Sequence, residues 1–533
     1  RCIYGVDLNE LATELARLSL WVHTFVPGLP LTFLDYNMRT GDSLAGIGTL
    51  DEVTDMLDVE QASLSMFTGG SSVIKEIRDD IEELGQFADT SAEQVEAARE
   101  TRRELDEQLE PVRARFDILA ASRIDDEVNT AAASDTNIDD PTTLSSYERA
   151  KEALASTTPI HFPAAFPEVF INDGGFDVIV GNPPWEKTQI ERHEFWARHQ
   201  PGLRALSQGK REDVISGLEE ERPDLLEDFN QEKLVEEKRG DLLVNGPYPD
   251  IGKTHPDLYK AFVWRFWALN KSGGYTGVVL PRATFITPSM EKYRNEIVAD
   301  GNIIDLTFVV NNRNWVFSEV HPQFTIAFAS IRKSKPDGKG TIPIRGPYPN
   351  PESFEQGVQS NPHYFDAEAA KDWAGSAKFP LLPAAPESVA AFNRMDESTR
   401  LSSESSWHPV PYQELNATQD KTRDDGTTVI DTTDDPPDEY WPVYKGESYD
   451  IWNPDREVYF GWADPGIVTD YLHEARASSY KYAGSRSAFS DMSEDWIEDP
   501  STLPCRSARI VFRDVTRHND SRTVRAALIP PNR

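Results

Sequence analysis

A run of apolar residues that stops at two consecutive prolines constrains this chain more than any other feature. Residues 176–185 read FDVIVGNPPW, and the apolar part has the composition of a buried strand. Proline lacks a backbone N–H and has a fixed φ angle, so Pro183 and Pro184 end both a helix and a strand ladder. The sequence therefore predicts a buried strand that ends at Asn182 in a stiff turn, followed by the indole of Trp185.

Alternating strand and helix patterns on both sides of a long insertion predict an α/β fold. Residues 1–50 read as a strand (CIYGVDLN), a helix (ELATELARLSLWVHTF) and a second strand with a Gly-Asp turn (LTFLDYNMRTGDSLAGIG). The pattern resumes at residues 166–335, where IIDLTFVV and FTIAFASI predict an antiparallel hairpin at one edge of the sheet. We expect residues 1–50 and 166–335 to form one doubly wound, Rossmann-like domain.

The remaining segments predict two helical insertions and a second domain. Residues 51–165 carry charged stretches with helical apolar spacing, which predict a helical hairpin. Residues 187–250 are a second polar, acidic helical segment within the α/β domain. The insertion 51–165 has two interpretations, contact with nucleic acid or solvated helical packing. Residues 336–533 are rich in proline and predict a separate, mixed α and β domain.

Composition narrows the class of protein. Two distant cysteines and ten unclustered histidines predict neither a disulfide framework nor a metal site, and an intracellular, cytoplasmic protein is the default. No apolar run approaches the ~18 residues of a membrane span. The net charge, 54 − 90 = −36, suits a halophilic cytoplasm, with an acidic mesophilic protein as the alternative. Nucleic-acid binding therefore requires a local basic surface.

The turn itself has the chemistry of a pocket for a planar amine. The side-chain oxygen of Asn182 and the Pro183 carbonyl provide two acceptors, which suit an exocyclic amino group with two hydrogens. Trp185 offers a stacking face of about nucleobase size. At the carboxyl end of a strand, this combination is typical of a site for a base that has left its stack. The alternative is a proline-rich loop whose tryptophan belongs to the core.

The NPPW sequence resembles the [DN]PP[YFW] catalytic motif of amino-group DNA methyltransferases. IYGVDLN, TGDSL and the order of elements to about residue 331 extend the resemblance. Within this class the chain is similar to large type II, subclass G restriction–modification enzymes and to BREX-type phage-defence methylases. The resemblance implies an S-adenosylmethionine-dependent fold that methylates adenine N6 in double-stranded DNA by base flipping.

The resemblance also assigns roles to residues. Asp7 would accept from the ribose hydroxyls of the cofactor and Asp42 would face its adenine, while Tyr259 and Phe262 would line the substrate pocket or belong to the core. The catalytic positions are Asn182, Pro183, Pro184 and Trp185. The family's FxGxG loop, expected upstream of Asp7, is absent from this sequence.

The C-terminal segment supplies a local excess of arginine. Residues 336–533 are similar to the target-recognition region of the same enzymes, and their arginines would contact DNA phosphates or guanine edges. The alternative is that these arginines pair with the protein's own acidic groups. The predicted DNA-binding residues are Lys445, Arg506, Arg509, Arg513, Arg517, Arg522 and Arg525. Other restriction or defence subunits are further expected partners.

Several rival functions stay open at this point. N4-cytosine methylation is the nearest, and methylation of a protein glutamine or of ribosomal RNA shares the NPP motif. A catalytically idle DNA-recognition subunit would explain the absent glycine-rich loop. No PD…(D/E)xK motif is present, so nuclease activity is not predicted for these residues. Cys505, in LPCRS, lacks the companion motifs of a cytosine-C5 methyltransferase.

Overall fold

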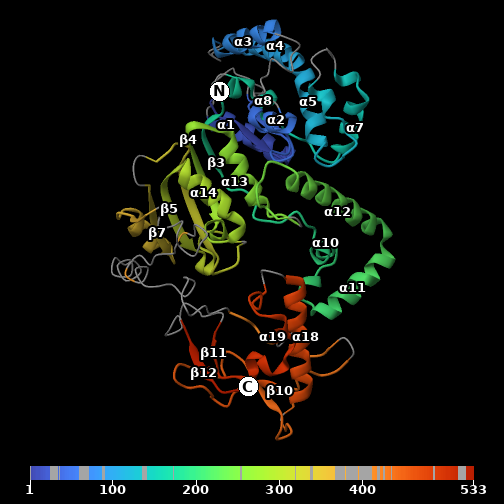
Figure 1. Cartoon of the computed structure of the whole chain (residues 1–533). Coiled ribbons are helices and arrows are strands. Elements are labelled where there is room, and N and C mark those ends of the chain that lie inside the picture. Colours follow the sequence, from blue (N-terminus) through green and yellow to red (C-terminus); the bar gives the residue numbers. More distant parts are fainter. Residues whose placement is uncertain are drawn as a thin grey trace. The chain divides into compact units, whose positions relative to one another are not determined.

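The chain divides into two compact units, Arg1–Ser398 and Thr399–Arg533, which are described separately (Figure 1). The structure is a computed structural model, and it describes residues 2–23, 34, 36–58, 71–86, 91–134, 141–171, 173–252, 255–318, 320–336, 340–366, 379, 394, 411–416, 420–423, 426–433, 435–483, 487–513 and 524–532.

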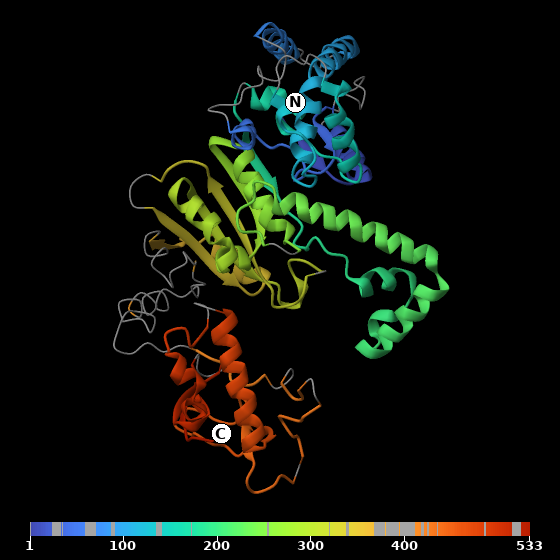
Figure 2. The same cartoon turned by 45° about the vertical axis from the view of Figure 1, so that its right-hand side comes forward.

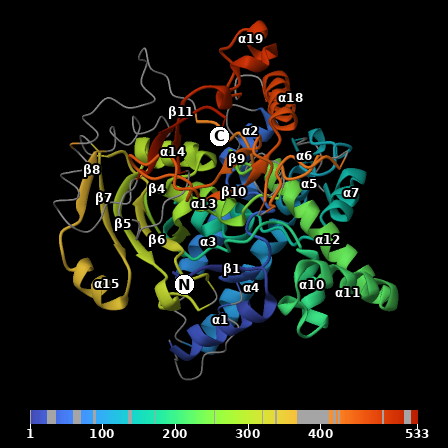
Figure 3. The same ribbon diagram turned by 90° about the horizontal axis from the view of Figure 1, so that it is seen from below.

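The first unit contains a six-stranded sheet in the order β3-β4-β6-β5-β7-β8, which Figure 3 shows from below. The strands are β3 Phe176–Gly181, β4 Asn270–Pro281, β5 Asn302–Val310, β6 Thr325–Arg332, β7 Thr341–Tyr348 and β8 His363–Asp366. β3 pairs with β4 and β5 with β7 in parallel, while the other pairs are antiparallel. The predicted α/β class is therefore confirmed as a mixed sheet.

Two details of the sheet differ from the sequence prediction. β5 and β6 pair antiparallel as predicted, but they lie inside the sheet rather than at its edge. The sheet also includes β7 and β8, so it extends past residue 335, where the sequence predicted that a separate domain begins. Helices α13 Leu258–Leu269 and α14 Glu291–Ala299 pack on the sheet, and α15 Pro351–Val358 packs against β7.

A second, two-stranded parallel sheet pairs β1 Gly5–Asp7 with β2 Met38–Thr40, and α1 Glu10–His23 follows β1. Although β1 does not pair with β3, both strands pack on one apolar cluster. Tyr4 and Val6 share that cluster with Phe176 and Ile179, and the rings of Tyr4 and Phe176 are 5.7 Å apart. The other members come mainly from the short helices α8 Phe162–Ala165 and α9 Pro167–Phe170. The two strands therefore share one apolar core.

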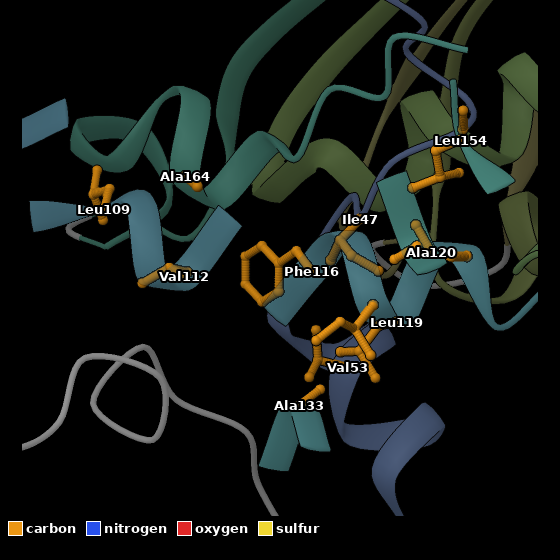
Figure 4. Packing of buried hydrophobic residues seen from close by; sticks show 14 of the residues in the cluster. Ile47, Val53, Leu109, Val112, Phe116, Leu119, Ala120, Ala133, Leu154 and Ala164 are labelled. Carbon is orange, nitrogen blue, oxygen red and sulfur yellow. The ribbon is translucent and has the colours of Figure 1, made fainter. Parts of the chain in front are cut away.

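Between β2 and β3 the chain is helical, as predicted. The helices are α2 Leu50–Leu57, α3 Ser71–Gln86, α4 Ala92–Gln108, α5 Glu110–Ala121, α6 Ala131–Ser134 and α7 Ser145–Ala153. Residues 92–121 form two consecutive helices, α4 and α5, and Pro111 lies in the first turn of α5, where its missing N–H costs little. Figure 4 shows the core of this region, in which Phe116 and Leu119 pack against Ile47 and Val53.

The segment after β3 forms a helical arm, shown in green in Figure 2. It consists of α10 Arg192–His199, α11 Gln208–Glu221 and α12 Pro223–Val244. Phe195, Trp196, Ile215 and Phe229 give the arm a small core of its own. The arm is therefore a packed helical subdomain.

The second unit is mixed α and β. It contains β9 Trp441–Tyr444, β10 Tyr459–Ala463, α18 Pro465–Ala483, α19 Glu494–Glu498, β11 Arg509–Phe512 and β12 Ala526–Ile529. Its core joins Val429 and Ile430 to residues of β9, β10 and α18, and includes the buried Cys505. Among the described residues of both units, no helix is long and apolar enough to cross a membrane.

A buried ionic cluster joins three parts of the first unit. Glu52 of α2 forms ion pairs with Arg123, after α5, and with Arg265 of α13, the latter at 3.0 Å. Arg265 also donates to the carbonyls of Leu44 and Gly46, at 3.2 and 2.9 Å. Burial alone would raise the pKa of Glu52, but the two guanidinium groups outweigh it and lower that pKa. The cluster therefore fixes the turn that follows β2.

We predict that Glu52→Gln lowers the free energy of unfolding of the first unit by about 3–5 kcal/mol, because it leaves two buried arginines without their carboxylate. The folded-state pKa of Glu52 lies below its ordinary value of 4.5, so this contribution is present above that pH and is lost as the pH falls through the folded pKa. Urea unfolding at neutral and acid pH measures both effects. Glu100→Gln, at an exposed pair with Arg103, is the control with little effect. Equal losses in the two variants would contradict the prediction.

Candidate functional site

The predicted turn lies at the carboxyl end of β3, at one edge of the six-stranded sheet. β3 runs parallel to β4, with Gly181 opposite Val278. Within the described residues β4 is the only neighbour of β3, and Val178 and Val180 are 58% and 80% exposed. The prediction of a buried strand is therefore wrong: β3 lies at the edge of the six-stranded sheet, and none of its residues is buried. The side-chain amide of Asn182 is exposed and makes no hydrogen bond within the described part of the chain. Its polar atoms are therefore accessible from solvent.

Trp185 is half-buried beside the turn. Its ring lies edge-on to Phe317, with centroids 6.3 Å apart, and both belong to a cluster around Val309 and Tyr348. The indole Nε1 is buried and has no acceptor among the described residues. The structure supports both interpretations of Trp185. Its ring adjoins the exposed turn, and part of the ring packs in the core.

Phe317 is held in place by the buried side chain of Asn311. The Asn311 oxygen accepts from the backbone N–H groups of Val316 and Phe317, at 3.0 and 3.1 Å. Its amide donates to the carbonyls of Phe317 and Val320, at 2.9 and 2.8 Å. One side chain thus organises the loop between β5 and β6 that forms the wall beside Trp185. Sequence reasoning missed Phe317, although the asparagine-rich end of β5 was a visible sign of a turn.

The residues after Trp185 pair with the segment that leads into α13. Leu258 N donates to the Glu186 carbonyl at 2.8 Å, and Thr188 N donates to the Pro256 carbonyl at 3.1 Å. Tyr259 is buried, and its pKa is raised by that burial and by Asp257. These bonds hold the turn against the start of α13.

Phe262 packs beside Leu44 and Tyr248 in a buried cluster. Tyr259 and Phe262 therefore both contribute to the core, which was the alternative to their predicted role. Their contact with substrate stays a prediction.

Asp7, at the end of β1, has a carboxylate that remains accessible. Its Oδ1 accepts from the Asn9 N–H at 2.8 Å, and the residue is exposed. Oδ2 has no hydrogen-bond or ion-pair partner among the residues that the structure describes. The carboxylate fits the predicted role of acceptor for a diol.

Asp42 lies in a different environment from Asp7. It is buried, its Oδ1 accepts from Leu44 N at 2.8 Å, and its Oδ2 pairs with Arg239 Nε at 3.0 Å. Arg239 belongs to α12, and a Cβ on the next residue, Gly240, would lie 3.3 Å from Thr188 Oγ1. The C-terminal part of α12 therefore packs against both Asp42 and the segment after Trp185. The predicted contact of Asp42 with adenine stays a prediction, and it requires that Arg239 share or release this carboxylate.

Arg282 is a cation at the same edge that the sequence analysis did not single out. It follows Pro281, the last residue of β4, and is half-buried. Burial lowers its pKa, and its Nε has no hydrogen-bond partner among the described residues. Its position directly after the apolar strand VVLP was the sequence feature that could have identified it.

The predicted DNA-binding cations of the second unit all have partners within that unit where the structure describes them. Arg517 and Arg522 lie outside the described residues. The guanidinium of Arg506 lies 4.6 Å from the centre of the Trp441 ring. Among the others, Lys445 pairs with Glu447 at 3.4 Å, Arg509 with Glu414 at 2.7 Å and Arg525 with Asp450 at 3.9 Å, while Arg513 donates to the Gly446 carbonyl. Arg509 supports the alternative that these arginines pair with the protein's own acidic groups, because the side chains of Arg509 and Glu414 are both mostly buried.

Comparison with protein families gives one match. Residues 1–211 match the family described as Eco57I restriction-modification methylase. This segment contains β1, β2, β3 and the Asn182–Trp185 turn. The resemblance predicted from NPPW and its companion motifs is therefore confirmed for this part of the chain. A search of curated proteins found no match.

Among solved structures, the chain is similar to proteins of restriction systems. One belongs to a type I R-M system (12% identity, TM-score 0.24, covering 44% of this chain and 48% of that one). Another is the type IIG restriction endonuclease BpuSI (12% identity, TM-score 0.27, covering 92% of this chain and 63% of that one). The chain thus spans about half the length of the first and under two thirds of the second. These TM-scores lie below the value that marks a shared fold.

We predict that Arg239→Ala lowers the free energy of unfolding by about 3–5 kcal/mol, because it leaves the buried Asp42 carboxylate without its guanidinium. Chemical unfolding of the variant measures the loss. Lys233→Ala is the matched control, since Lys233 lies on the same helix in an exposed pair with Glu237. If the two variants were equally stable, the pair between α12 and Asp42 would not be a structural contact of the folded protein.

Proposed function

We propose that this chain is the methylating part of a restriction–modification or phage-defence enzyme, which transfers a methyl group to adenine N6 in double-stranded DNA. The observation that carries the proposal is the placement of Asn182. Asn182 follows β3, so its unpaired side-chain amide lies at the carboxyl edge of the sheet. The half-buried Trp185 follows within the same stiff turn. The family match over residues 1–211 supports the reaction class.

The turn provides acceptors but no nucleophile. The Asn182 oxygen and the Pro183 carbonyl would accept from the two hydrogens of the target amine. Because position 184 is also proline, no backbone N–H competes for these acceptors there. Both hydrogen bonds leave the nitrogen lone pair free to point away from the ring toward an electrophile. Positioning and electrostatics then carry the catalysis.

Trp185 and Phe317 would bind the flipped base. Their rings meet edge-on, so one ring can lie flat against a base while the other closes the side of the pocket. A base removed from its stack loses a few kcal/mol of stacking, which contact with aromatic faces replaces. Arg282 and the exposed Lys187 are the local cations that DNA phosphates require in so acidic a chain.

S-Adenosylmethionine, the expected cofactor, would supply the electrophilic methyl group. The residues of this chain fit one part of it. The exposed Asp7 carboxylate suits the ribose hydroxyls, whereas the Asp42 carboxylate is buried and paired with Arg239. Binding would therefore involve Asp7 directly, and Asp42 would position the turn after β2. This partial fit is what favours the second candidate, a DNA-recognition subunit without catalysis.

We predict that Asn182→Ala lowers kcat for methyl transfer by about 10²–10³-fold, because one of two acceptors for the amine is lost. The measurement uses radiolabelled S-adenosylmethionine and duplex DNA with the full-length protein. Gln189→Ala, an exposed amide in the same segment, is the control with unchanged kcat. Methyl transfer at the normal rate in Asn182→Ala would place catalysis elsewhere. A wild-type protein that binds DNA but not the cofactor would support the recognition subunit.

A further inference from the structure

The turn after β2 (residues 41–48) lies against a short segment that precedes α8 (residues 158–162). Asp42 N donates to the Thr158 carbonyl at 2.7 Å, and Ile160 N donates back to the Asp42 carbonyl at 3.1 Å. The start of turn 41–48 is therefore held by backbone hydrogen bonds, which any residue at these positions could make. The end of the turn is held differently.

The imidazole of His161 binds the end of this turn. Its Nδ1 accepts from the Ile47 N–H at 3.0 Å, and its Nε2 lies 2.9 Å from the carboxylate of Asp117 on α5. The residue is only 6% exposed, and its ring lies beside that of Phe116, with centroids 5.6 Å apart. Because a backbone N–H can only donate, Nδ1 must be unprotonated, and Nε2 then carries the hydrogen that Asp117 accepts. The two contacts fix both the tautomer and the orientation of the ring.

Segment 158–162 is also joined to the strand that leads to the proposed catalytic turn. Phe162, which follows His161, donates its backbone N–H to the Ile47 carbonyl at 2.9 Å. Its ring lies 6.5 Å from that of Phe176, the first residue of β3. His161 is thus placed where turn 41–48 and β3 are tied to the same few residues.

His161 differs from the other ionisable groups around the turn in its chemistry near neutral pH. Between about pH 5 and pH 8 a histidine side chain can gain a proton, whereas carboxylates and guanidiniums keep their charge. A proton on Nδ1 would set an N–H against the Ile47 N–H and break their hydrogen bond. The attachment of the end of the turn therefore depends on the protonation of this one ring. The carboxylates and guanidiniums that face the ring or flank the turn are Asp42, Glu52, Asp117, Arg123, Arg239 and Arg265.

We propose that His161 is a positioning residue for the cofactor. In its neutral form it holds turn 41–48 in the conformation that binds S-adenosylmethionine, and protonation releases the end of the turn. The inference rests on the proposed function, which assigns this turn to the cofactor site through Asp42. His161 acts through the turn and does not touch the cofactor itself. Because the Asp42 carboxylate is buried and already paired with Arg239, a small shift of the turn decides whether the cofactor can reach it.

Two substitutions separate the roles of the two ring nitrogens in the full-length protein. In His161→Asn the amide oxygen takes the place of Nδ1 and can still accept from the Ile47 N–H. In His161→Gln the amide nitrogen takes the place of Nε2 and can still donate to Asp117. Each variant keeps one of the two hydrogen bonds, so a merely structural role predicts similar losses in both. His193→Asn, at a partly exposed histidine of α10, is the control.

We expect His161→Gln to weaken the binding of S-adenosylmethionine about five- to tenfold with kcat unchanged, which is the effect of losing one hydrogen bond that holds the turn. His161→Asn should bind the cofactor as the wild type does. Calorimetry measures the affinity, and hydrogen exchange at the Ile47 amide, which requires no cofactor, should be faster in His161→Gln alone. On acidification from about pH 8 to about pH 5 the affinity of the wild type should fall more than that of His161→Asn.

The outcomes separate this inference from the proposed function. If the wild type binds the cofactor and methylates DNA, but His161→Asn and His161→Gln bind the cofactor equally well, the histidine is only structural and the inference fails alone. The same holds if the affinities of the wild type and His161→Asn change equally with pH. A wild type that does not bind S-adenosylmethionine overturns the proposed function and this inference together.

Discussion

A carboxylate buried between two arginines holds the first unit together. Glu52 comes from the helical insertion, Arg265 from the helix that leads into β4, and Arg265 also binds the carbonyls of the turn after β2. The approach is so close that a Cβ at Gly48 would lie 1.6 Å from the Arg265 guanidinium. A buried charge without its partner costs several kcal/mol, so these three segments must assemble as one. The insertion is thus part of the domain's architecture, not an appendage.

The functional edge of the sheet depends on this assembly. The cluster fixes the turn that contains Asp42, and Arg239 ties Asp42 to the helical arm. The arm in turn packs through Gly240 against the segment that follows Trp185. Asp7, Asp42 and Asn182 lie far apart in sequence, yet each lies at or just after the end of a strand, and ordinary packing brings these strands into one unit. A change in the arm would therefore reach both the predicted cofactor residues and the predicted catalytic turn.

The sequence predicted the local features well and the long-range ones poorly. The existence of a strand before Asn182 and the β5–β6 pairing follow from periodicity and from proline, which act over a few residues. The place of that hairpin inside the sheet, the Arg239–Asp42 pair and the Phe317 wall depend on contacts between distant segments, which periodicity does not encode. Likewise, the arginine-rich C-terminal segment predicted a local positive charge, but it did not predict that the Arg509 side chain is mostly buried.

The identity of the methylated atom tests the central claim most directly. Duplex DNA is incubated with the full-length protein and isotopically labelled S-adenosylmethionine, digested to nucleosides and analysed by mass spectrometry. We predict that the label appears in N6-methyladenine. Label in N4-methylcytosine would leave the assignment of the catalytic residues unchanged but identify cytosine as the methylated base. Label in protein or RNA, or in no nucleoside while the DNA is bound, would contradict the assignment of this chain as a DNA adenine methyltransferase.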